Sequence, residues 1–252
     1  GGMSGKSFMP VSSICRVDRA RLATGAKNRN KRATRRIVLR EAQTEEFWML
    51  ESQDTSDTLP TYSRKVFWKR FVWDDHAFVR FIYPNWHRVD DELYRSAHPS
   101  PRRLRIAKKR GICSVLTLRG EALNPPNVIE RRAASHLGLD LKFVALRAMA
   151  LPPPERLLRL IDLLRTMPKP MLVHCKSGSD RTGLAVTLYL HVIKGQPLET
   201  ARRALSWKYG HQSFGSAGVV HRLLDAYAAA HAATGIGFED WVRQDYDAAA
   251  LM

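Results

Sequence analysis

One cysteine in this chain stands where a nucleophile could act. Cys175 follows the apolar residues 171–173 and precedes a small, polar loop that ends at Arg181, after which residues 184–192 form an apolar run of helical length. This order predicts a buried strand, a tight loop and a buried helix. We call residues 175–181 the cysteine loop.

The cysteine loop has the composition of an oxyanion site. Its small residues let successive backbone N–H groups turn inward beside a helix N-terminus, and such a nest binds anions. Arg181 adds a planar fork of donors that can hold two oxygens of one phosphate. Because the same groups favour a thiolate, we expect the pKa of Cys175 to be lowered. The residues predict a nucleophile facing a bound phosphorus, and the alternative is a buried structural cysteine at a strand end.

Residues 174–183 resemble the Cys-x5-Arg-Ser/Thr loop of the cysteine-dependent phosphatases, the tyrosine and dual-specificity class. By this resemblance Cys175 attacks phosphorus to give a phosphocysteine, and Arg181 stabilises the equatorial oxygens. The Thr182 hydroxyl supports the thiolate as leaving group, and His174 lies beneath the loop and helps to set the pKa of the cysteine. The substrate-binding residues that the resemblance implies are Lys176, Ser177, Gly178, Ser179, Asp180, Arg181 and Thr182.

A phosphatase of this kind needs a proton donor for the leaving oxygen, and a positioned acid contributes roughly 10²–10⁴-fold. Many relatives place an Asp on the loop that corresponds to residues 147–154, and this loop holds none. Two candidates remain, Asp180 in the cysteine loop and Glu155 in the first turn of the next helix. Myotubularin-like lipid phosphatases and certain mycobacterial-type phosphatases resemble this chain in carrying an Asp at the loop position of Asp180, where it serves as the acid. This resemblance favours Asp180. The alternatives are a helix cap for Asp180 and a partner of the helix dipole for Glu155.

Four further residues have possible roles in the site. Lys176 adds positive charge at the mouth of the pocket, a feature that phosphoinositide phosphatases share, or it faces solvent. Arg147 could bind a second anionic group, and Gln212 could orient the hydrolytic water if its loop returns over the pocket. Cys113 could form a disulfide with Cys175 under oxidation, as in a few relatives, or be a buried strand cysteine.

From residue 86 onward, strands and helices alternate with short joints. We expect a hairpin over residues 86–97, strands over 112–118, 141–146 and 171–174, and helices over 101–110, 126–137, 153–167, 182–194, 198–208 and 217–233. This order predicts an α/β fold with a mostly parallel central sheet, flanked by helices on both faces, with the cysteine loop at the C-terminal end of a strand. Residues 86–235 resemble the compact bacterial and fungal members of the dual-specificity class.

The chain before residue 86 lacks this pattern. We expect residues 1–60 to be a basic, partly disordered extension that contains one short helix. Residues 61–85 are expected to be an aromatic and basic connecting segment that packs on the core, and an interfacial membrane segment is the alternative. Residues 86–252 are then the phosphatase domain.

The 252 residues carry a formal net charge of +17, from 41 Lys and Arg against 24 Asp and Glu. Basic residues cluster in residues 16–40 and 102–110. Such clusters suit an anionic partner, which could be nucleic acid, lipid or an acidic protein, or they form a solvated basic face. No zinc-finger, RNA-binding or helix-turn-helix signature accompanies the charge.

The three cysteines show no spacing typical of a zinc site or a disulfide framework, which favours a reducing compartment. No stretch approaches the ~20 apolar residues that span a bilayer. We therefore expect a cytoplasmic protein with no transmembrane segment and with no metal or other cofactor.

These features predict an enzyme that hydrolyses phosphate monoesters through a phosphocysteine intermediate. Phosphorylated protein, with protein tyrosine or dual-specificity activity, is the first expectation for its substrate, and a phosphoinositide or other phospholipid headgroup is the second. A different class remains open, a catalytically silent module that binds phosphate and docks through its basic N-terminal region on an acidic partner.

Overall fold

The computed structural model of the chain describes residues 84–212 and 218–251. The predicted extension, residues 1–60, and nearly all of the connecting segment, residues 61–85, lie outside these ranges. Within them, five strands form one sheet in the order β1-β2-β5-β3-β4. Neighbouring strands are parallel except for the edge strand β1, which pairs antiparallel with β2. The predicted α/β class with a mostly parallel sheet is confirmed.

The elements follow the predicted order. The strands are β1 (His87–Arg88), β2 (Leu93–Ser96), β3 (Ser114–Thr117), β4 (Asp140–Phe143) and β5 (Met171–His174). The helices are α5 (Pro101–Lys109), α6 (Pro125–His136), α7 (Pro154–Thr166), α8 (Asp180–Leu188), α9 (Leu198–Ala201), α10 (Val219–Thr234) and α11 (Phe238–Gln244). Ser100 and Asn124 cap α5 and α6 by accepting backbone N–H groups, and a proline opens each helix.

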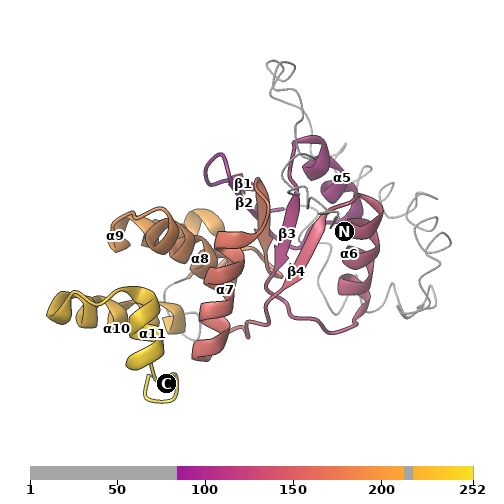
Figure 1. The fold of residues 1–252 in the computed structure, drawn as a ribbon. Helices are drawn as coiled ribbons and strands as arrows, with labels where there is room; N and C mark the ends of the chain where they lie inside the picture. Colours follow the sequence, from indigo (N-terminus) through magenta and orange to yellow (C-terminus); the bar gives the residue numbers. More distant parts are fainter. Residues whose placement is uncertain (1–83, 213–217, 252) are drawn as a thin grey trace, which may run out of the picture.

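Helices cover both faces of the sheet, with α5 and α6 on one face and α7, α8, α10 and α11 on the other (Figure 1). Successive strand residues serve opposite faces, as the period of a strand requires. Val115 and Leu172 pack in the cluster beneath α5 and α6, whereas Leu116 and Val173 pack in the larger cluster beneath α7 and α8. The central strand β5, buried on both sides, delivers the cysteine loop to the C-terminal end of the sheet.

The helix predicted over residues 198–208 is wrong in its extent. It stops after α9, and a 3₁₀ turn, Arg202–Ala204, follows. The carbonyl of Ala204 accepts a hydrogen bond from Nη1 of Arg95 at 2.7 Å. Leu205 then leaves the helical region, with φ −101° and ψ 79°. A contact between distant residues thus overrides the local helix propensity.

The other helices differ from prediction mainly at their ends. The helix predicted over residues 182–194 begins at Asp180 and closes in a π-helical turn, Tyr189–Ile193. The pattern did not predict α11. This short helix is held by an aromatic contact between its Phe238 and Tyr227 of α10, whose ring centroids are 4.9 Å apart.

Cys113 and Cys175 lie at opposite ends of the sheet. Cys113 directly precedes β3 and Cys175 directly follows β5, and these parallel strands pair in register from Ser114 with Met171 to Thr117 with His174. A disulfide requires Cα atoms within about 7 Å. The disulfide considered between these two cysteines is therefore excluded by the fold, and Cys175 is a free thiol.

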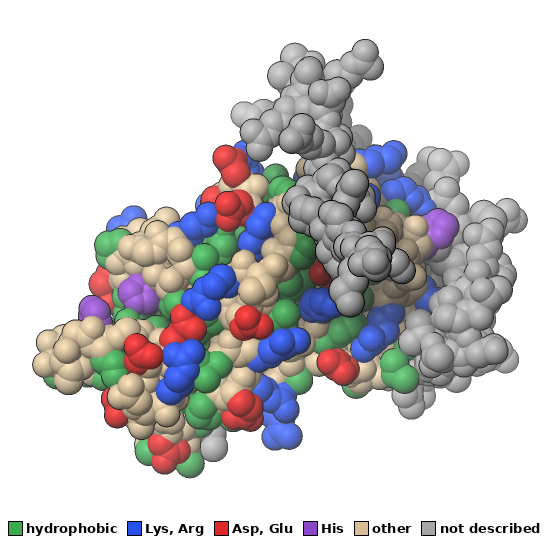
Figure 2. All heavy atoms as spheres, viewed as in Figure 1, with side chains coloured by type: hydrophobic (Ala, Val, Ile, Leu, Met, Phe, Trp, Pro, Cys, Tyr) green, Lys and Arg blue, Asp and Glu red, His purple; other side chains and the backbone are tan. Residues whose placement is uncertain are grey.

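Charges of both signs alternate on the face shown in Figure 2, over α7 and α11. Arg165 of α7 and Glu239 of α11 are 2.5 Å apart, so some of these charges pair across elements. The second basic cluster, residues 102–110, lies along α5 with Lys109 and Arg110 exposed. None of the helices in the described ranges has the length and hydropathy that crossing a bilayer requires.

Candidate active site

Cys175 lies at the floor of the cysteine loop, between β5 and α8. Its side chain is 1% exposed, and Sγ accepts the backbone N–H of Gly178 at 3.2 Å. Burial raises the pKa of the thiol. The charge of Arg181, the nearby polar groups of Thr182 and the N–H of Gly178 lower it by more, so the pKa of Cys175 is lowered overall. The loop therefore stabilises the thiolate, the nucleophilic form.

Arg181 is held beside the thiol by the ends of two strands. Its Nη1 donates to the carbonyl of Leu146 at 3.2 Å and lies 3.5 Å from that of Leu118. The remaining N–H groups of its guanidinium make no hydrogen bond within the described ranges. The arginine is thus oriented by one nitrogen while others remain available to an anion.

The close approach of the cysteine loop to β2 requires glycine at position 178. Its φ is +78°, and a Cβ there would lie 2.7 Å from backbone atoms of Ser96 and Ala97. Any other residue would have to push β2 away as well as adopt an unfavourable backbone conformation.

Arg95 of β2 supports the loop from behind and was not identified from the sequence. This side chain is almost fully buried, and its Nη2 donates to the carbonyl of Gly178 at 2.8 Å. Its guanidinium also stacks 3.8 Å from the ring centroid of Tyr209. An arginine between apolar strand positions was the available signal, because a buried charge needs partners.

Two further groups hold carbonyls of the loop. Nδ2 of the buried Asn85 donates to the carbonyl of Ser177 at 3.1 Å. The backbone N–H of His98 donates to the carbonyl of Lys176 at 3.2 Å. Nothing in the local pattern around Asn85 indicated this role.

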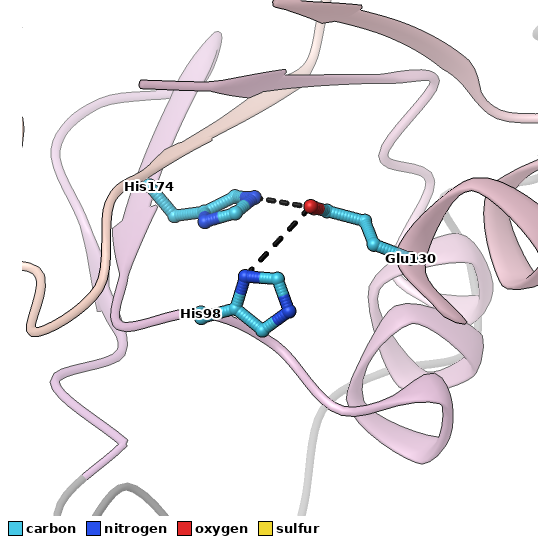
Figure 3. A group of neighbouring side chains, drawn as sticks. All are labelled: His98, Glu130 and His174. Carbon is cyan, nitrogen blue, oxygen red and sulfur yellow. Dashed lines mark hydrogen bonds and ion pairs between the residues drawn. The ribbon is translucent and has the colours of Figure 1, made fainter. Parts of the chain in front are cut away.

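His174 ends β5 beneath the loop and belongs to a buried cluster with His98 and Glu130. Glu130 extends from α6 toward both imidazole rings (Figure 3). Its Oε1 lies 2.5 Å from Nε2 of His174, and its Oε2 lies 3.7 Å from Nδ1 of His98. Nδ1 of His174 is 3.2 Å from the carbonyl oxygen of Cys175. His174 therefore contacts the cysteine loop through this backbone carbonyl.

These three side chains also have the chemistry of transition-metal ligands, with donor atoms within 4.8 Å of one another. Two ligands of one tetrahedral zinc ion stand roughly 3 Å apart or more, because each bond is about 2.0–2.2 Å long. The contact between His174 and Glu130 is shorter, at 2.5 Å. The cluster is therefore a hydrogen-bonded pair packed beside a second imidazole, and the contact with His174 gives the buried carboxylate a polar partner.

Replacing Glu130 by glutamine should destabilise the domain by about 1–3 kcal/mol, because the amide keeps the shape but loses the charge-assisted bond to His174. Urea unfolding followed by circular dichroism measures the loss. The matched control is Glu121→Gln, at an exposed position, which should leave the midpoint unchanged. Equal midpoints for the two variants would contradict this role of Glu130.

Asp180 opens α8, and its carboxylate meets a histidine that the sequence analysis did not single out. Oδ1 of Asp180 lies 2.6 Å from Nδ1 of His211, and Nε2 of His211 lies 2.9 Å from Nε2 of His221. The Asp180 side chain is 32% exposed, whereas that of His211 is 1% exposed. The carboxylate is thus held by a buried partner and open to solvent on its other side.

The remaining candidates lie around this centre. Lys176 is half-buried within the loop, and the exposed Arg147 directly follows Leu146, which holds Arg181. Gln212 is exposed and directly follows His211. Glu155 is exposed in the first turn of α7, and within the described ranges no hydrogen bond or ion pair joins it to the cysteine loop. Of the two candidate proton donors, Asp180 thus lies in the cysteine loop and Glu155 makes no such contact with it.

Residues 90–200, which contain the whole cysteine loop, match the model of the Tyrosine phosphatase family. This range is less than half of the chain, and over it the chain is similar to the tyrosine phosphatase family. None of the curated proteins matches this chain at a significant level.

Solved structures similar to this chain include TpbA of P. aeruginosa, with 21% identity and a TM-score of 0.45 over 59% of this chain and 91% of that one. Tk-PTP in its active form has 23% identity and a TM-score of 0.43, over 57% of this chain and 98% of that one. PTPMT1 has 18% identity and a TM-score of 0.42, over 57% of this chain and 99% of that one.

Proposed function

We propose that this domain hydrolyses phosphate monoesters through a phosphocysteine at Cys175. Its proposed substrates are phosphorylated proteins, and its proposed activity is that of a tyrosine or dual-specificity phosphatase. The observation that carries the proposal is a buried thiol whose pKa is lowered by Arg181 and by donors of its own loop. A thiolate in an anion-binding loop can attack a bound phosphoryl group, whereas a structural cysteine needs no such donors.

The proposed reaction has two steps. In the first, Sγ of Cys175 attacks phosphorus, the S–P bond forms as the bond to the leaving oxygen breaks, and Asp180 gives that oxygen its proton. In the second, the Asp180 carboxylate takes a proton from water as the water oxygen attacks phosphorus, and the S–P bond breaks to release inorganic phosphate. Arg181 and the loop N–H groups hold the equatorial oxygens, and Thr182 stabilises the departing thiolate.

The side chains beside the loop support a protein substrate. Arg147 and Met149 follow the carbonyl that holds Arg181, and Met149 is 65% exposed. An apolar and a basic side chain together suit an aromatic phosphate within an acidic peptide. Lys176 adds positive charge in the same region.

Trapping of the intermediate tests the proposal. Wild-type protein is mixed with a phosphotyrosine peptide, a phosphoserine peptide and a phosphoinositide in separate reactions, quenched in acid and digested. The expected result is turnover of the phosphotyrosine peptide with one phosphoryl group on the peptide that contains Cys175. If the phosphoinositide were turned over in preference to both peptides, the substrate class would be a phospholipid headgroup and not a phosphorylated protein. The absence of turnover on all three would leave the phosphate-binding module as the better explanation.

Asp180→Asn should reduce turnover of an alkyl phosphate by about 10²–10³-fold and that of an aryl phosphate with a good leaving group far less, because only the alkoxide needs a proton. The measurement is kcat/KM on both substrates at one pH. The matched control is Glu155→Gln, which should change neither value. Equal losses on the two substrates for Asp180→Asn would rule out the acid role.

A further inference from the structure

The carboxylate of Asp180 is not free to rotate, because one of its oxygens is bound inside the protein. Nδ1 of His211 contacts Oδ1 at 2.6 Å, while Oδ2 makes no hydrogen bond with any residue of the described ranges. His211 is almost fully buried and Asp180 is partly exposed. One oxygen is therefore an anchor, and the other has no hydrogen-bond partner among the described residues.

The turn that carries His211 is itself fixed against the cysteine loop. The turn runs through a 3₁₀ segment, Trp207–Tyr209, and the N–H of His211 donates to the carbonyl of Ser206 at 3.2 Å. Asn85 bridges the two segments, because its Nδ2 donates to the carbonyls of both Tyr209 and Ser177, at 2.8 and 3.1 Å. The imidazole of His211 is thus held at a fixed position relative to the cysteine loop.

His221 of α10 determines which nitrogen of His211 carries the proton. Its Nε2 lies 2.9 Å from Nε2 of His211, so one of the two rings must donate. Burial, the largest cause, lowers the pKa of His221, the charge of Arg202 lowers it further, and Asp225 opposes them. A neutral His221 that donates from Nε2 leaves His211 with its proton on Nδ1, where it can be donated to Asp180.

We propose that His211 is the positioning residue of the general acid: its Nδ1–H holds Oδ1 of Asp180 so that Oδ2 carries the transferred proton, and His221 fixes the tautomer. This inference rests on the proposed function, since it assigns a partner to the proposed proton donor. A carboxylate that is held in place loses less conformational entropy on reaching the transition state than a freely rotating one.

Two substitutions at one position test it. His211→Asn keeps an N–H donor close to the Nδ1 position, and His211→Phe keeps a ring without a donor. We expect His211→Phe to lose about 10- to 100-fold in kcat on an alkyl phosphate, with KM and the turnover of an aryl phosphate nearly unchanged, and His211→Asn to restore most of the loss. Equal losses on both substrates, or no rescue by asparagine, would overturn the proposal.

A double-mutant cycle separates positioning from a general structural effect. Because His211 acts through Asp180, His211→Phe should cost little more on the alkyl phosphate in an Asp180→Asn background. Additive losses would show that His211 acts elsewhere and would overturn the proposal.

A readout without turnover distinguishes this failure from that of the proposed function. If wild-type protein shows no hydrolysis that depends on Cys175, the phosphatase proposal fails, and the catalytic assignment of His211 falls with it. In that case long-range ¹⁵N–¹H NMR of the imidazoles can still test the contact between Nδ1 of His211 and Oδ1 of Asp180. We expect a proton on Nδ1 of His211 and on Nε2 of His221, and a His211 that carries its proton on Nε2 alone would refute the assigned contact.

Discussion

Replacing Cys175 by serine is expected to reduce hydrolysis of a chromogenic aryl phosphate by on the order of 10⁴-fold or more. The lowered pKa of Cys175 shows that its surroundings stabilise the thiolate, whereas a serine hydroxyl stays protonated at the same position. The measurement is kcat at saturating substrate. The control is binding of inorganic phosphate, which should persist, because the loop N–H groups and Arg181 are unchanged. Turnover by Cys175→Ser within 10-fold of the wild type would exclude Cys175 as the nucleophile.

The same thiolate should be visible without a substrate. An ordinary thiol has a pKa of about 8.5, and that of Cys175 is lowered. The thiolate therefore persists as the pH falls below 8.5, and alkylation of Cys175 by iodoacetamide should slow only at the lower pKa. Inorganic phosphate should protect the thiol, because both anions use the same donors. Loss of alkylation near pH 8.5 would contradict the stabilisation.

Arg181→Lys is expected to cost about 10³-fold in kcat, although the charge is kept. One nitrogen of Arg181 is occupied by the carbonyl of Leu146, at 3.2 Å, and the others are left for phosphate oxygens. An ammonium group has its three donors on one nitrogen, and it lacks the planar fork that donates two parallel hydrogen bonds to two oxygens of one phosphate.

The matched control for this variant is Arg159→Lys. Arg159 is exposed on α7 and pairs with Asp162 at 3.5 Å, away from the cysteine loop. Its replacement should leave kcat and KM unchanged. An Arg181→Lys enzyme within 10-fold of the wild type would show that charge alone is needed, and the proposed two-oxygen contact would fail.

The fold was predictable because its signals are local. The apolar run before Cys175 became β5, and the glycine-containing polar loop became a turn with φ +78° at Gly178. The caps at Ser100 and Asn124 fixed two helix starts. Such features depend on residues within about four positions of one another, so the sequence order alone contains them.

The supports of the site were not predictable in the same way. Glu130 lies 44 residues from His174, and His211 lies 31 residues from Asp180. Each contact exists only because the fold brings two elements together, and either residue alone has an ordinary interpretation on a helix or in a polar loop. The broken helix after α9 has the same cause, since Arg95 takes a carbonyl that a helix would have used.

The contacts behind the cysteine loop have a consequence for the cost of the reaction. Each peptide unit has its C=O and its N–H on opposite sides. The carbonyls of Lys176, Ser177 and Gly178 are all held on the outer side, by His98, Asn85 and Arg95. The three following N–H groups must then face inward before any phosphate arrives. The dipoles that stabilise the developing negative charge are thus oriented when the protein folds. Little free energy is then needed to reorient them in each turnover.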